Sequence, residues 1–262
     1  MVCNDIIQML EQLSPPSYAC SWDNVGLLVG RRNQPVHRIV VGLDATDQLI
    51  SYGIQSKADM IITHHPMIYS SMKRINDDDF IGRKILLLAE HGIAYYAMHT
   101  NFDIKGSMAD LAAQRMELQE TKPLDVTVET ETGAEGIGRV GLYKNEITLE
   151  DMAHKVKEAF GLEQVLVYGE KDTKVHNLAI SPGSGKSVIG EAIKAGADVL
   201  ITGDIGHHDG LDAMEQGLCI IDAGHYGIEH IFIDYIKEYL DGLLSGDVTI
   251  STWKGGVPYE VI

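Results

Sequence analysis

Cysteine is scarce in this chain, with three residues among 262. Cys3, Cys20 and Cys219 show neither a C-x-x-C spacing nor an even-numbered set, which argues against a disulfide framework. Small secreted domains often depend on paired cysteines, whereas free thiols are typical of reducing compartments. We therefore predict a reduced, cytoplasmic setting.

Long apolar runs and positive charge are also lacking. No stretch approaches the roughly 18 apolar residues of a membrane span, and the segment from Met1 to Leu13 is too acidic for us to expect a signal peptide. The chain has 21 Lys and Arg against 38 Asp and Glu, a net charge of -17. This charge repels nucleic-acid backbones and anionic membranes, so we predict neither partner. A phosphate-bearing ligand would need a local cation, most simply a metal.

The length suits one large domain or two ordinary ones, and short apolar runs between helical patterns indicate an α/β fold. The run Asp59–Thr63 predicts a buried strand that leads into His64, His65 and Pro66. Because Pro66 cannot continue a central strand, we expect the strand to end at the histidines. Open α/β sheets bind ligands at the carboxyl ends of strands, where imidazoles can hold metal. The alternative is one capping and one solvent-facing histidine.

Three more groups of ligand-type residues follow predicted strand ends. Glu229 lies one helical turn after His225, so both side chains can point to the same side of a helix. The alternative is a capping histidine and an exposed glutamate. The groups are His99 with Asp103, Asp204 with His207 and His208, and Asp222 with His225 and Glu229.

Five of these residues exceed what one catalytic zinc requires, since such sites use three protein ligands. The set suits two metals about 3.5–4 Å apart that share a carboxylate, for which Glu229 is the candidate. Adjacent side chains diverge in an extended strand, so His64 and His65 would serve one ion each. Imidazole and carboxylate ligands suit Zn, Mn, Fe or Co. The predicted ligands are His64, His65, Asp103, His225 and Glu229.

The second half of the chain repeats the first at a constant offset. Residues 38–41 align with 177–180, and residues 57–63 align with 196–202, which indicates duplicated α/β units or a coincidence between two βαβ units. Between them, Glu117–Glu135 is rich in Thr and Glu and predicts a connector. The stretch Ser181–Ser187 resembles a phosphate-binding P-loop, but Ile180 replaces the required glycine, so we expect a Gly-Ser turn.

Four motifs together resemble the Nif-three-like family, whose bacterial members are often labelled GTP cyclohydrolase type-two homologues. The resemblance implies two interlinked α/β domains, a dinuclear metal site and a ring-shaped homohexamer. By motif, it implies one metal on His64, Asp103 and Glu229, another on His65, His225 and Glu229, and His99 close by. The motifs are residues 22–30, 62–66, 99–103 and 224–229.

We therefore predict an α/β protein of two interlinked domains, each a sheet flanked by helices, with the second inserted into the first. Because the ligands come from both chain ends, the first domain would comprise residues 1–124 and 223–262, and the second 125–222. The resemblance implies a metal-activated water that opens the guanine imidazole ring of GTP, with His99, His207 or His208 moving protons. The alternatives are a dinuclear phosphohydrolase or amidohydrolase on another small molecule, and a non-enzymatic metal-binding assembly or regulatory protein.

Overall fold

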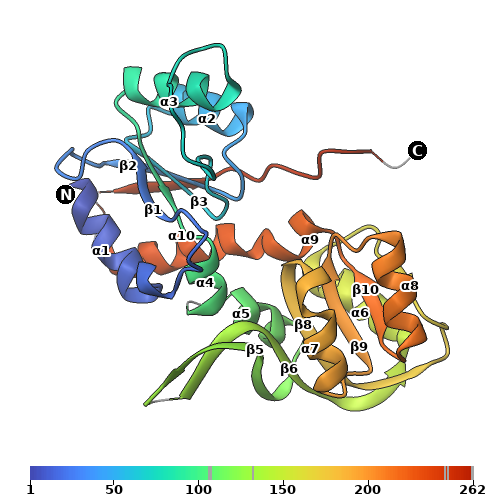
Figure 1. Ribbon diagram of the computed structural model, residues 1–262. Helices are drawn as coiled ribbons and strands as arrows, with labels where there is room; N and C mark the ends of the chain where they lie inside the picture. Colours follow the sequence, from blue (N-terminus) through green and yellow to red (C-terminus); the bar gives the residue numbers. More distant parts are fainter. Residues whose placement is uncertain (106–107, 132, 245, 247, 261–262) are drawn as a thin grey trace. The chain divides into compact units, whose positions relative to one another are not determined.

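The computed structural model describes residues 1–105, 108–131, 133–244, 246 and 248–260. The chain divides into two compact units (Figure 1), of which unit 1 comprises Met1–Gly106 and Phe232–Pro258. Unit 2 comprises Ser107–Ile231 and Tyr259–Ile262. Each unit contains one sheet with helices, which confirms the predicted α/β class. The domain limits at residues 124 and 223 stay a prediction, and Val261 and Ile262 lie outside the described residues.

Unit 1 contains a five-stranded sheet in the order β1-β4-β3-β2-β11. Strands β2, β3, β4 and β11 are parallel, and β1 is antiparallel to β4. The strands are β1 (Gly26–Val29), β2 (Arg38–Gly42), β3 (Met60–Thr63), β4 (Ala94–Ala97) and β11 (Thr249–Thr252). The helices are α1 (Cys3–Leu13), η1 (Pro16–Tyr18), α2 (Asp47–Gln55), α3 (Phe80–Glu90), α4 (Thr100–Ile104) and α10 (Ile231–Leu243), whose first residue is assigned to unit 2.

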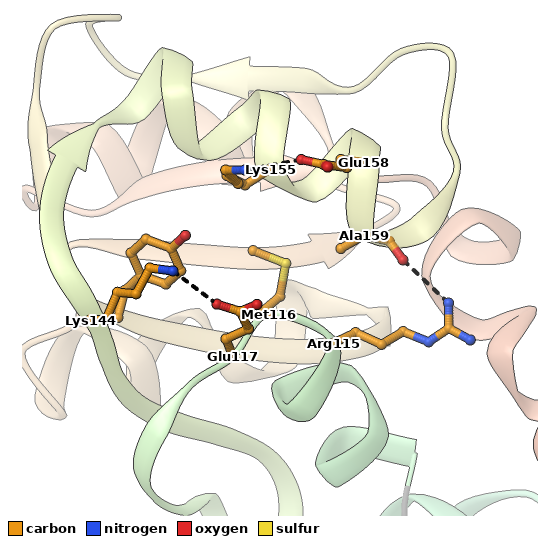
Figure 2. Close-up of a pocket in the computed structure, with 8 residues that line it drawn as sticks. Arg115, Met116, Glu117, Lys144, Lys155, Glu158 and Ala159 are labelled. Carbon is orange, nitrogen blue, oxygen red and sulfur yellow. Dashed lines mark hydrogen bonds and ion pairs between the residues drawn. The ribbon is translucent and has the colours of Figure 1, made fainter.

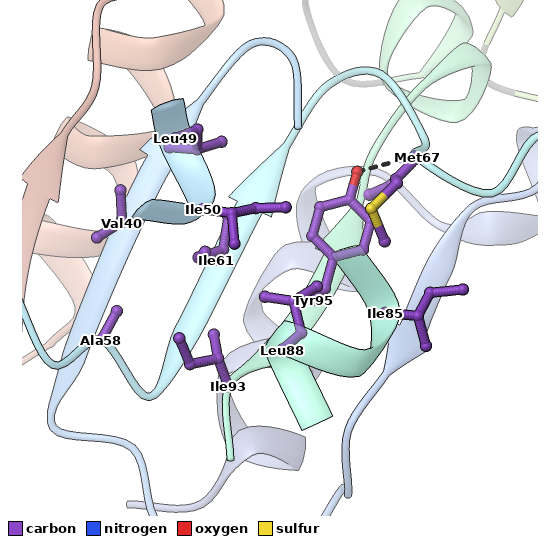
Figure 3. Packing of buried hydrophobic residues seen from close by; sticks show 11 residues of the cluster. Val40, Leu49, Ile50, Ala58, Ile61, Met67, Ile85, Leu88, Ile93 and Tyr95 are labelled. Atoms are coloured by element: carbon purple, nitrogen blue, oxygen red, sulfur yellow. Dashed lines mark hydrogen bonds between the residues drawn. The ribbon is translucent and has the colours of Figure 1, made fainter. Parts of the chain in front are cut away.

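The core of unit 1 follows from the alternation of side chains along its strands. Val40, Ile61 and Tyr95 project from neighbouring strands onto the face that packs against Leu49 of α2 and Leu88 of α3 (Figure 3). All five residues are at most 1% exposed, so this face excludes water. The parallel strands therefore bring their carboxyl ends together at one edge of a rigid sheet.

Unit 2 contains a six-stranded sheet in the order β5-β6-β8-β9-β10-β7. Its central strands β8, β9 and β10 are parallel, and one core cluster joins them to α7 and α8. The strands are β5 (Gln119–Thr130), β6 (Gly133–Thr148), β7 (Leu166–Tyr168), β8 (Lys174–Ser184), β9 (Val199–Gly203) and β10 (Cys219–Asp222). The helices are α5 (Met108–Arg115), α6 (Leu149–Phe160), η2 (Gly185–Val188), α7 (Ile189–Lys194), α8 (His207–Glu215) and α9 (His225–Glu229).

The predicted connector at Glu117–Glu135 is wrong, because most of this segment is strand. β5 pairs antiparallel with the first part of β6 and forms the edge of the sheet of unit 2. Of the β5 side chains whose burial is described, Leu124 is the buried one. Leu124, Val126 and Val128 alternate with polar residues, as in a strand, but the Thr and Glu residues around them hide this pattern.

The hydrogen bonds of the two units support the internal repeat. The carboxylate of Asp59 accepts bonds from the backbone N–H groups of residues 37 and 38, at 2.7 and 2.9 Å. Asp198, at the aligned position, accepts bonds from the N–H groups of residues 176 and 177, both at 2.8 Å. The five-residue helices α4 and α9 likewise follow the corresponding strands β4 and β10. Asp103, His225 and Glu229 lie on these two short helices, and His99 directly precedes α4.

Candidate metal centre

The first cluster of ligand-type side chains lies in unit 1, at the carboxyl ends of β3 and β4. β3 ends at Thr63, as Pro66 predicts, and α4 begins directly after His99. His64, His65 and His99 each offer one ring nitrogen as a possible metal ligand, and these three nitrogens lie within 4.8 Å of one another. Nε2 of His64 is also 3.5 Å from Oδ1 of Asp103 on α4. Unit 1 thus brings three imidazoles and a carboxylate together.

The rings of His64 and His65 lie closer than their adjacency predicts, with centroids 4.8 Å apart. The expectation of divergence holds for an extended strand, but here the backbone leaves the strand after Thr63. The buried hydroxyl of Tyr95 holds this turn, because it donates to the carbonyl of His65 at 2.8 Å and accepts from the N–H of Met67 at 3.0 Å. Burial raises the pKa of Tyr95, so the phenol stays protonated and can donate.

Each imidazole of this cluster is oriented through its Nδ1 atom. His64 Nδ1 donates to the carbonyl of Met98 at 2.7 Å, and the Nδ1 atoms of His65 and His99 lie 2.7 and 2.9 Å from carboxylate oxygens. The carboxylates belong to Asp44 and Asp23, respectively. A proton held on Nδ1 leaves the lone pair on Nε2, which is how histidines are prepared to bind metals. Sequence reasoning had given neither aspartate this role.

Asp23 is the centre of a small hydrogen-bond network that positions His99. Its carboxylate accepts bonds from His99 Nδ1 and from the backbone N–H and hydroxyl of Thr100. Burial acts to raise the pKa of Asp23, but the hydrogen bonds from His99 and Thr100 outweigh it and lower the pKa to about 2. Asp23 is therefore ionised at neutral pH and fixes the orientation of the His99 ring.

The second cluster lies in unit 2, on α9. Its two ligand-type side chains point to the same side of the helix, with His225 Nε2 3.1 Å from Oε2 of Glu229. His225 Nδ1 lies 2.7 Å from Oδ2 of Asp204, which repeats the arrangement of the first cluster. Glu229 is only 3% exposed. A carboxylate so far removed from water needs a cation or strong donors beside it.

A glycine makes room for the Glu229 carboxylate. A Cβ atom at Gly183 would lie 2.6 Å from Glu229 Oε1 and 3.7 Å from His225 Nε2. Gly183 also has a φ of +82°, a conformation that residues with a side chain rarely adopt. Sequence reasoning placed Gly183 in a Gly-Ser turn, whereas the structure extends β8 to Ser184. The backbone approach to Glu229 is what requires glycine here.

The distances within the two clusters suit metal ligands. Two ligands at about 2.1 Å from one tetrahedral ion lie roughly 3.4 Å apart. The His64–Asp103 and His225–Glu229 pairs, at 3.5 and 3.1 Å, are close to this separation. The clusters therefore fit a divalent metal in donor type, donor orientation and spacing.

The other predicted catalytic histidines lie elsewhere in unit 2. His207 and His208 are the exposed first residues of α8, with ring centroids 5.2 Å apart. They follow Asp204, the partner of His225, after two intervening residues. The two histidines therefore lie on the segment that also carries the partner of His225. Their part in proton transfer stays a prediction.

A separate recess in unit 2, about 250 Å³ in volume, contains none of the predicted site residues (Figure 2). Its lysines are neutralised by glutamates, since Lys144 lies 3.2 Å from Glu117 and Lys155 lies 3.0 Å from Glu158. Arg115 donates to the carbonyl of Ala159 at 3.2 Å. Exposed ion pairs of this kind are weak and common on surfaces. We therefore place the candidate site at the histidine clusters.

The fold and these clusters define a class of protein: a two-unit α/β chain whose imidazoles and carboxylates can hold a metal ion. The chain belongs to the Duf34/NIF3 (NGG1p interacting factor 3) family, whose model matches residues 1–254. This match confirms the resemblance carried by the four motifs. Among the described residues, no helix combines the length and the apolar character needed to cross a bilayer.

Relatives of known sequence or structure extend this result. A protein of Clostridium perfringens named GTP cyclohydrolase 1 type 2 homolog is 33% identical over 100% of both chains. The crystal structure of a Bacillus cereus protein related to NIF3 has a TM-score of 0.87 at 23% identity, covering 100% of this chain and 99% of that one. Reduced HcgD from Methanocaldococcus jannaschii has a TM-score of 0.82 at 30% identity, covering 96% and 97%. The first two similarities concern whole chains, so they apply to both units.

Proposed function

We propose that this protein is a metal-dependent hydrolase that holds two divalent ions per chain. One ion would be held by His64, Asp103 and Glu229, and the other by His65, His225 and Glu229. The observation that carries the proposal is the repeated arrangement of imidazoles, each anchored at Nδ1 by an oxygen atom. A structural role for these histidines does not require their Nε2 atoms to gather around carboxylates.

The covalent chain supports a shared Glu229. In unit 1 the ring of Phe232 packs against His64, with centroids 5.3 Å apart. Glu229 precedes Phe232 by three residues, and three residues of fully extended chain span at most about 11 Å. The link therefore limits how far the Glu229 backbone can lie from the backbone of Phe232. A carboxylate with two oxygens can then serve both ions.

The protein side chains would orient a substrate and move protons. Divalent ions, when bound, lower the pKa of water to about 7 and so supply a nucleophile at neutral pH. His99 would accept or release a proton at Nε2, because its Nδ1 is held by Asp23. His207 and His208 are the further candidates for this role. The names of the relatives favour the guanine imidazole ring of GTP as the reacting group.

One observation favours a second candidate, a dinuclear phosphohydrolase or amidohydrolase acting on a less charged molecule. A triphosphate would need lysine or arginine side chains to bind it, and two candidates, Lys186 and Arg83, are already paired with aspartates. Lys186 lies 3.0 Å from Asp209, and Arg83 lies 3.7 Å from Asp47. With a net charge of -17, the protein offers little other attraction for a polyanion.

A product assay separates these activities from a non-enzymatic role. Metal-loaded protein is incubated with GTP and then with a panel of phosphoesters and amides, and formate, phosphate and amine are measured. Formate from GTP that disappears in His65→Ala supports the cyclohydrolase. Phosphate or amine release supports the second candidate. No turnover of any substrate by fully metal-loaded protein would contradict both and leave a metal-binding assembly or regulatory protein.

The metal count is tested by elemental analysis of purified protein. We expect two ions per chain, loss of both in Glu229→Ala, and partial retention in His64→Ala. His37→Ala is the control, because His37 is exposed and lies outside both clusters. Full retention of metal in Glu229→Ala would rule out the shared carboxylate.

The family resemblance also leads us to propose a homohexamer in a cytoplasmic setting. The net charge and the scarcity of cysteine agree with a cytoplasmic protein. A small molecule, rather than nucleic acid or a membrane, would be the substrate.

A further inference from the structure

Two large aromatic side chains lie exposed beside the histidine cluster of unit 1. Trp22 is 56% exposed and Tyr69 is 55% exposed. Their ring centroids are 5.9 Å apart and their planes are inclined by 42°. Only 6% of the chain is aromatic and it has two tryptophans. An exposed tryptophan beside an exposed tyrosine therefore stands out from the rest of this surface.

These rings continue the line of imidazoles outward from the cluster. The Trp22 ring lies 6.0 Å from that of His99 in an edge-on arrangement, and His99 lies 5.5 Å from His65. A molecule resting on Trp22 would therefore have His99, and beyond it the metal ligands, as its next neighbours.

The segments that carry the two aromatic residues are tied together and to the cluster. Asn24, two residues after Trp22, donates from Nδ2 to the carbonyl of Ile68, the residue before Tyr69, at 2.6 Å. Asp23, between Trp22 and Asn24, is held by His99 and Thr100. The backbones under both rings are thus fixed relative to His99, so a ligand would not have to order them.

We propose that Trp22 and Tyr69 form a stacking surface for the flat heteroaromatic ring of the substrate, and that the substrate class is a purine or a related fused heterocycle. This proposal rests on the proposed function, because it assumes that the histidine clusters act on the bound molecule. A planar ring can stack on the indole face and touch the inclined phenol ring. Stacking recognises the ring face without requiring positive charge, which suits a protein with a net charge of -17.

Direct binding is measured with Trp22 as the reporter. Trp253 is the other tryptophan and packs 5.0 Å from Tyr52, against the core cluster that contains α2. In Trp253→Phe, emission comes from Trp22 alone. We expect saturable quenching by guanosine and by adenosine, and no quenching by ribose 5-phosphate. Equal responses to all three, or to none, would overturn the proposal.

The contribution of each ring is measured by equilibrium dialysis of guanosine against metal-loaded protein. Trp22→Ala should weaken binding roughly 10-fold or more, a typical loss for one stacked base, whereas Trp22→Phe should retain most of it. Tyr69→Ala should weaken binding less. Phe80→Ala is the matched control, because Phe80 is an exposed aromatic residue of unit 1 on α3. Metal content should be unchanged in all four variants.

The outcomes distinguish this proposal from the proposed activity. Guanosine binding that depends on Trp22, with no formate released from GTP, supports the stacking surface and contradicts the cyclohydrolase. Formate release with the same KM for GTP in Trp22→Ala and Tyr69→Ala supports the activity and overturns the stacking surface. Unchanged guanosine affinity with a loss of assembly in Trp22→Ala would assign the rings to a subunit contact and also overturn it.

Discussion

The position of the Glu229 carboxylate depends on the absence of a side chain at Gly183. A methyl group there would meet Glu229 Oε1 at 2.6 Å, and the φ of +82° would be strained as well. We expect Gly183→Ala to weaken metal binding by roughly 10- to 100-fold, as changes next to metal ligands do. Gly190→Ala is the control, because nothing lies within 4 Å of its Cβ position. Equal metal affinity in the two variants, measured by competition with a chelator, would contradict this role.

The ionised carboxylate of Asp23 makes stability depend on pH. Its pKa is lowered from 3.8 to about 2, so the stabilisation is complete above the ordinary pKa and is lost as the pH falls through 2. The difference amounts to about 2 kcal/mol. Asp23→Asn should lower the free energy of unfolding by about this amount near pH 7, and by roughly half of it near pH 3. Urea unfolding at the two pH values tests this, and an equal difference at both would contradict it.

The turn after β3 is held by a side chain of the neighbouring strand, that of Tyr95 in β4. Its hydroxyl contacts Thr63 Oγ1, the carbonyl of His65 and the N–H of Met67. Tyr95→Phe removes the hydroxyl and leaves these buried groups without a hydrogen-bond partner, which should lower the free energy of unfolding by about 1–3 kcal/mol. We expect a lower melting temperature and weaker metal binding. Tyr52→Phe is the control, since Tyr52 is only partly buried; equal effects of the two changes would contradict a role for the Tyr95 hydroxyl at the turn.

At the scale of the whole molecule, binding of the proposed metal ions should stabilise the fold, because a ligand that binds the folded chain and not the unfolded one favours folding. A ligand present at about 100 times its Kd adds about 2.7 kcal/mol to the folded state. We expect chelation to lower the melting temperature, and stoichiometric divalent metal to restore it. The same treatment of Glu229→Ala should have little effect. A wild-type melting temperature that does not respond to chelation would contradict this coupling.

Assembly is a second property of the whole molecule. The family resemblance implies a homohexamer, so light scattering should give six times the 28.8 kDa of one chain. A monomer mass at micromolar concentration would contradict the proposal.

The amino-acid sequence by itself determined the features that depend on residues close together in the chain. Pro66 stops β3 at the histidines, the four-residue spacing puts His225 and Glu229 on one side of α9, and the repeated block at residues 57–63 and 196–202 predicts equivalent strands. Each of these follows from the period of a helix or strand, or from the geometry of proline.

Only the tertiary structure decided the contacts between residues distant in sequence. The aspartates that orient His65, His99 and His225 lie 21, 76 and 21 residues away from them. Which strand ends meet depends on strand order and register, and no local pattern records either. The edge strand β5 was missed because its alternating apolar residues, Leu124, Val126 and Val128, lie in a segment rich in Thr and Glu. Its pairing with β6 in the tertiary structure identifies it as a strand.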